Sequence, residues 1–171
     1  MRPVLRPKQI GVDNVIESVP PDKLFVDVLH RSVKRMMEGE NGMPATAPTV
    51  KVINLSIGDP VRQLASTMSP IARLVDYLSL KYKVLFIISA GNHGEVTSFI
   101  QNTFSELKSS NILQRGKIFF NTMEANQRNL KVLAPAESLN SLTVGALYDD
   151  NTDSAESDRF IWALEKGLPS P

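Results

Sequence analysis

The sequence predicts an α/β fold with a mostly parallel sheet flanked by helices. Two apolar, β-favouring segments, residues 50–58 and 84–90, enclose residues 69–82, which have the period of an amphipathic helix. Short joints connect the three segments, so they form a strand–helix–strand unit, which implies parallel strands and a right-handed crossover. Residues 141–147 predict a third strand.

The remaining elements follow in chain order. A short extended segment is expected between Pro3 and Pro7, whereas residues 13–19 have no clear period. Pro20-Pro21-Asp22 resembles a helix start, and the apolar residues after it predict a helix from about residue 21 to 39. Residues 38–48 contain two glycines and two prolines and predict a loop.

The helix over residues 69–82 has the clearest start signal, because Ser69 can cap its first turn and Pro70 suits its first position. A long helical region follows the second strand. It is expected to hold one helix around residues 100–107 and another over 117–128.

Composition excludes several classes of protein. The 171 residues are 42% hydrophobic and 22% charged with a net charge of +1, which is ordinary for a globular domain and indicates neither nucleic-acid nor membrane binding. There is no cysteine, and His30 and His93 cannot form a multi-histidine metal site. The acidic cluster near residues 149–158 does not have the spacing of an EF-hand loop. No cofactor is expected, and no compartment is assigned.

The segment Ser89-Ala90-Gly91-Asn92 ends the second strand with small residues and an asparagine amide. In open α/β sheets, ligands bind at the carboxyl ends of strands. An amide fixed there can donate a hydrogen bond to a developing negative charge. A simple turn after the strand is the alternative for this tetrapeptide taken alone, since Gly and Asn are common in turns.

Three signatures in a fixed order resemble the middle of a subtilisin-like serine protease, the subtilase family. They are Val52-Ile53-Asn54-Leu55-Ser56-Ile57-Gly58, Ile87-Ile88-Ser89-Ala90-Gly91-Asn92, and Pro135 followed by Thr143-Val144-Gly145-Ala146. The similarity covers about residues 50–147 directly. It implies a single partial catalytic domain over residues 1–171 with a three-layer fold, a helical insertion at about 96–133 and a cis peptide bond before Pro135.

The family's catalytic motifs are absent from this sequence. There is no Gly-Thr-Ser for the nucleophile and no Asp-Thr-Gly or Asp-Ser-Gly for the aspartate. His93-Gly94 is followed by Glu95 rather than Thr, and it comes after the asparagine instead of before it. Because the family order is Asp, His, the region seen here and then Ser, the chain is expected to be a central piece that is inactive alone.

The resemblance assigns roles to seven residues. Asn92 would be the side-chain donor of the oxyanion hole, and Ser56, Ile57 and Gly58 would pair with the main chain of a peptide or protein substrate. Ser89, Ala90 and Gly91 would line the pocket for the residue before the scissile bond.

The predicted function is therefore the substrate groove and oxyanion donor of a serine endopeptidase. A pseudoprotease or a peptide-binding α/β module is the alternative, and a nucleotide-binding domain is disfavoured because no glycine-rich loop precedes a helix. The expected partners are substrate and the remainder of the parent domain. We also expect the isolated piece to self-associate through the exposed edge of strand 50–56, unless its amino-terminal segment covers that edge.

Overall fold

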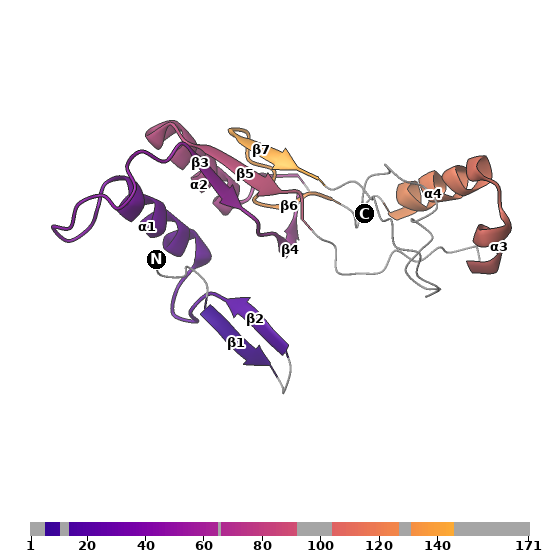
Figure 1. Cartoon of the computed structure of the whole chain (residues 1–171), viewed down its shortest axis with the longest axis horizontal. Coiled ribbons are helices and arrows are strands. Elements are labelled where there is room, and N and C mark those ends of the chain that lie inside the picture. The colour runs from indigo at the N-terminus through magenta and orange to yellow at the C-terminus, as the bar shows by residue number, and fades with distance from the viewer. Residues whose placement is uncertain (1–5, 11–13, 65, 92–103, 127–130, 146–171) are drawn as a thin grey trace.

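The structure is a computed structural model that describes residues 6–10, 14–64, 66–91, 104–126 and 131–145. Its centre is a three-stranded parallel sheet in the order β3-β5-β7 (Figure 1), formed by β3 Val52–Leu55, β5 Leu85–Ser89 and β7 Ser141–Val144. The predicted α/β class and parallel sheet are confirmed.

Helix α2, Pro70–Tyr82, connects β3 to β5 and begins where the sequence predicts. The Ser69 hydroxyl accepts a hydrogen bond from the backbone N–H of Ala72 at 3.2 Å, and Pro70 occupies the first helical position. The helix ends at Lys83, whose left-handed backbone (φ 55°) turns the chain into β5. One strand–helix–strand unit thus positions the middle of the sheet.

Helix α1, Phe25–Met37, begins later than the sequence predicts. The stretch after Pro20 forms a turn, closed by a hydrogen bond from the Lys23 N–H to the Pro20 carbonyl, and the helix starts after Leu24. Proline suits the second position of a β-turn as well as the first turn of a helix, and here the β-turn is formed.

The core lies between one face of the sheet and the two helices. Phe86 and Ile88 alternate along β5 toward that face and are fully buried. They belong to one cluster with buried residues of both helices, which are Leu29, Val33, Ile71, Val75 and Leu78. Each such side chain contributes about 1.5–3 kcal/mol by leaving water.

The carboxyl ends of α1 and α2 are joined by polar contacts at the surface. Lys81 lies 2.7 Å from Glu38, and the Tyr82 hydroxyl donates to the same carboxylate at 2.8 Å. Both contacts lower the pKa of Glu38, while burial raises the pKa of Tyr82. A second pair, Arg31 with Glu40, connects α1 to the loop that follows it.

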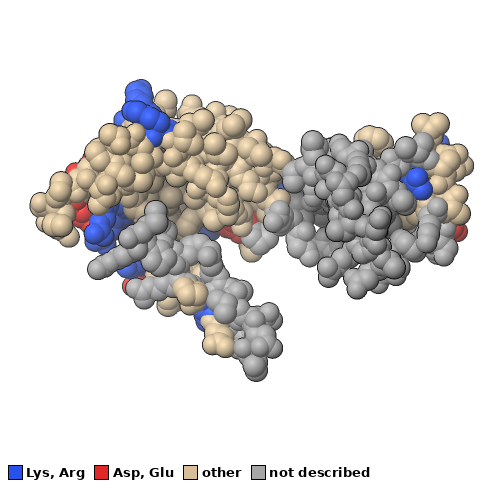
Figure 2. Space-filling view, viewed as in Figure 1, with Lys and Arg blue, Asp and Glu red and all other residues tan. Residues whose placement is uncertain are grey.

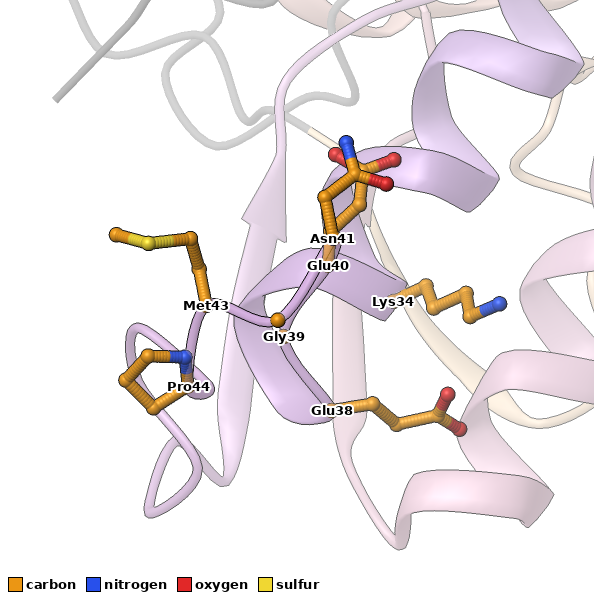
Figure 3. Close-up of a pocket in the computed structure, with 8 residues that line it drawn as sticks. Lys34, Glu38, Gly39, Glu40, Asn41, Met43 and Pro44 are labelled. Carbon is orange, nitrogen blue, oxygen red and sulfur yellow. The ribbon is translucent and has the colours of Figure 1, made fainter.

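That loop turns sharply at Gly39, whose φ is +87°. A shallow hollow beside it is lined by Lys34, Glu38 and residues 39–44 (Figure 3), with Lys34 and Glu38 on one side of the chain and Met43 on the other. A Cβ atom at Gly39 would overlap the Met43 carbonyl oxygen, so only glycine fits this turn.

Two small antiparallel pairs complete the strands. β1 Arg6–Ile10 pairs with β2 Asn14–Ser18, and β4 Asp59–Gln63 pairs with β6 Leu133–Ala134. Of these four strands, β2, β4 and β6 are not predicted by the sequence. The β1-β2 pair forms a separate sheet and neither strand pairs with β3, so the described part of the amino-terminal segment does not extend the central sheet at the edge of β3.

The region predicted as a helical insertion contains α3 Phe104–Ser109 and α4 Ile112–Asn126, which lie apart from the sheet in Figure 1. Asn111 caps α4: its side-chain oxygen accepts from the Gln114 N–H at 2.9 Å, and the Gln114 side chain accepts from the Asn111 N–H at 3.1 Å. The predicted cis peptide bond is present between Ala134 and Pro135. Within the described residues, no helix has the length and apolar character needed to cross a membrane.

Candidate functional site

The predicted site residues on β3 and β5 meet at one edge of the sheet. Leu55 of β3 pairs in register with Ile88 of β5, so the segments 56–58 and 89–91 leave the sheet side by side. Six of the seven predicted site residues lie in these two segments. The seventh, Asn92, lies outside the described residues, as does His93.

The segment after β5 is held by backbone hydrogen bonds on both sides. The Ala90 N–H donates to the Val144 carbonyl at 2.9 Å, and the Ala90 carbonyl accepts from the Leu133 N–H at 3.1 Å. The Ser89 hydroxyl accepts from the Gly91 N–H at 3.2 Å. Gly91 has a φ of +108°, a conformation that strongly favours glycine, and thus ends the strand at a fixed position.

The segment after β3 forms a tight local turn. The Ile57 N–H donates to the Leu55 carbonyl at 3.0 Å, and the Ile57 side chain packs against the core. The Ser56 hydroxyl is exposed and lies 3.3 Å from the Asn54 side-chain oxygen. Ile57 therefore uses its amide internally, and Ser56 is the outward side chain of the three.

Gly58 lies against the second segment. A Cβ atom at Gly58 would be 3.4 Å from the Gly91 Cα and 3.2 Å from the Leu133 Cδ1. Two glycine backbones thus approach each other closely, which a larger residue at either position would hinder. The strand ends form a common wall of backbone and small side chains.

Leu133 is the residue at this site that the sequence did not single out. It belongs to β6, and its side chain is 1% exposed and packs against both glycines. The sequence pattern of strand β6 is weak because β6 has two residues, too few to show the alternation of a strand. Its partner β4 contains a proline, which disfavours a strand prediction there as well.

The turn after β6 is anchored to α2. Asp76 accepts hydrogen bonds from the Ser138 hydroxyl and the Asn140 N–H, both at 2.7 Å. Glu137 accepts from the Ser69 N–H at 3.0 Å. These contacts fix the chain between Pro135 and β7, directly after the two residues of β6.

The described residues contain no catalytic triad at this edge. His30, the described histidine, lies on α1 in an edge-to-face contact with Tyr77 of α2, with ring centres 6.3 Å apart. The described groups with a shifted pKa lie away from this edge, on α1, at the end of α2 or in the loop after α1; they are Arg31, Glu38, Glu40, Lys81 and Tyr82. Within the same residues, no cluster of His, Cys, Asp and Glu could hold a metal ion.

Comparison with protein-family models decides the family. The Subtilase family model (Peptidase S8) matches residues 24–160, or 137 of the 171 residues. The chain belongs to the subtilase family. Searches of curated proteins and of solved structures give no match.

Membership makes this subtilase chain a protease-type domain of the serine-peptidase class. The match includes both strand ends and β6, so the edge described above lies inside the family's domain. The subtilase resemblance proposed from the three sequence signatures is confirmed.

Proposed function

We propose that this chain is the central part of a subtilisin-type serine endopeptidase. In this proposal, residues 56–58 pair with the main chain of the peptide, and residues 89–91 line one wall of the pocket for the residue before the scissile bond. Asn92 donates to the oxyanion. The supporting observation is the pair of small-residue strand ends that lie together at the carboxyl edge of a parallel sheet. The catalytic Asp, His and Ser are supplied by the remainder of the parent domain.

The chemistry suits the residue types. A neutral asparagine amide donates a hydrogen bond without competing for protons, and it follows Gly91 directly in the sequence. Because Ala90 is hydrogen-bonded to both β6 and β7, the chain enters position 92 from a rigid support. A preorganised donor of this kind stabilises charge that develops only in the transition state.

The outer face of the sheet supports the proposed partner, the remainder of the parent domain. Val52, Leu85, Leu142 and Val144 lie on this face and are 41–51% exposed. The surface over these strands consists mainly of uncharged residues in Figure 2. Parallel sheets are normally covered on both faces, so we propose that the rest of the domain packs here.

The edge of β3 supports a further expectation for the isolated chain. Among the described residues, β3 pairs only with β5. A strand edge beside an apolar face favours association, so the isolated chain should form dimers or larger species through β3. Analytical ultracentrifugation tests this, and a strictly monomeric chain at high concentration would contradict it.

A peptide-binding module without catalysis is the second candidate, because the described residues hold no triad. The two candidates differ in one measurement. A fluorophosphonate probe should label a serine in the full-length parent if the parent is an enzyme, and it should leave the isolated chain unlabelled in either case.

The decisive variant for the enzyme is Asn92→Ala in the full-length parent. We expect kcat to fall by about 10²–10³-fold, the value known for the oxyanion asparagine of subtilisin, a member of this same family. KM should barely change, because the amide meets the oxygen fully only once it carries charge. Asn126→Ala, at the end of α4, is the matched control and should keep full kcat. An Asn92→Ala enzyme with unchanged kcat would refute the oxyanion role.

A further inference from the structure

The side chain of Leu133 fills the space between the two strand ends. A Cβ atom on Gly91 would lie 2.5 Å from the Leu133 Cγ, 2.6 Å from its Cδ1 and 2.7 Å from its Cβ. A Cβ atom on Gly58 would lie 3.2 Å from the same Cδ1. One leucine therefore occupies the room that both glycines leave by having no side chain.

Leu133 cannot easily move out of this position. Its own N–H is bonded to the Ala90 carbonyl, and the neighbouring Val132 carbonyl accepts from the Leu64 N–H at 3.0 Å. Antiparallel pairing with β4 holds the strand from the other side. The side chain is 1% exposed, so swinging it into water would lose about 1.5–3 kcal/mol of burial.

The two segments that Leu133 touches are those assigned to substrate binding. A pocket between residues 56–58 and 89–91 would receive the side chain of the residue before the scissile bond. The depth of such a pocket depends on what stands behind the glycine walls, and here a packed leucine stands there. A long or aromatic substrate side chain would have to displace it.

We propose that Leu133 sets the size of this pocket and restricts the residue before the scissile bond to a small side chain, such as Gly, Ala or Ser. This inference rests on the proposed function, since it takes the same edge as the substrate site. It adds the substrate class and names a specificity-determining residue on β6.

The test is a series of peptides that differ only in the residue before the scissile bond, offered to the full-length parent. We expect kcat/KM for Ala to exceed that for Leu and Phe by about 10²-fold, since a pocket discriminates by about 10–200-fold per methylene. Leu133→Ala should raise the ratio of kcat/KM for the Phe peptide to kcat/KM for the Ala peptide by at least about tenfold. Wild-type enzyme that prefers Phe or Leu would overturn the inference while leaving the proposed function intact.

Loss of a buried leucine also reduces stability, so a matched control is needed. Leu78→Ala removes an equally buried leucine from α2, away from the strand ends. Leu78→Ala should leave the Phe-to-Ala ratio of kcat/KM unchanged. An equal change of this ratio in Leu78→Ala and Leu133→Ala would overturn the inference. If the parent hydrolyses none of the peptides, the proposed function fails. Calorimetric binding of the same series then tests the pocket, and tighter binding of Phe than of Ala would overturn the inference.

Discussion

Gly91→Ala tests whether the junction of the strand ends is as tightly packed as the distances indicate. The φ of +108° at this position costs a residue with a side chain about 1–3 kcal/mol. The new methyl group would also overlap three Leu133 atoms at 2.5–2.7 Å, and overpacking of this kind costs about 1–3 kcal/mol. The free energy of unfolding should therefore fall by about 2–6 kcal/mol.

Gly42→Ala separates the two contributions. Gly42 also has a positive φ, +78°, but no atom lies within 4 Å of a Cβ placed there. The free energy of unfolding of Gly42→Ala should fall only by the cost of the positive φ, about 1–2 kcal/mol. Urea unfolding followed by far-ultraviolet circular dichroism measures both variants, and equal losses would refute the packing argument.

The double variant Gly91→Ala/Leu133→Ala isolates the contact itself. Leu133→Ala alone should cost about 2–5 kcal/mol as a buried leucine. It also removes the Cγ and Cδ1 atoms that the new methyl group would overlap, leaving only the Cβ at 2.7 Å. The double variant should thus be about 1–2 kcal/mol more stable than the sum of the two single losses. Additivity within about 0.5 kcal/mol would mean that the two residues do not contact each other.

Gly39→Ala should be more destabilising than Gly42→Ala in the same urea assay, because it adds a backbone overlap to a similar positive φ; the reverse order would contradict the turn geometry. Glu38→Gln should reduce stability more at about pH 7 than at about pH 3. Contacts led by Lys81 hold the folded-state pKa of Glu38 below its ordinary value, so their stabilisation is present above the unfolded-state pKa and lost as the pH falls through the folded-state pKa. An effect that is the same at both pH values would exclude this ion pair as its source. Asp76→Ala should speed amide hydrogen exchange in residues 138–140, since it removes two hydrogen bonds to that turn. Unchanged exchange there would show that the turn is held without Asp76.

The strand–helix–strand unit could be predicted from the sequence because its signals are local. Ser69 and Pro70 mark the start of α2 by capping and by a fixed φ, and both act within one turn. The alternation of Phe86 and Ile88 toward the core falls within a single apolar run. The pairing of the site segments followed from the same unit, since parallel strands end at the same edge.

The missed features depend on contacts between distant segments. β4 contains Pro60 and Arg62 and is a strand only because it pairs with β6, about 70 residues away in the sequence. The late start of α1 reflects the fact that proline is favoured both at the second position of a β-turn and at a helix start. Leu133 was missed because β6, like β4, is a strand only through this long-range pairing. Its importance comes from two glycines that are 33 residues apart, and neither predicts the other.

The arrangement at this edge separates two functions that one active site must combine. The proposed oxyanion donor follows Gly91, whose position is set by backbone hydrogen bonds of Ala90 to β6 and β7. The size of the proposed pocket instead depends on the side chain of Leu133. Only the backbone N–H of Leu133 takes part in those hydrogen bonds. A substitution at position 133 that keeps the backbone should therefore change which peptide is cleaved while leaving the donor in place. Substitution of Gly91 acts on both, because its φ and its contact with Leu133 are properties of the same residue.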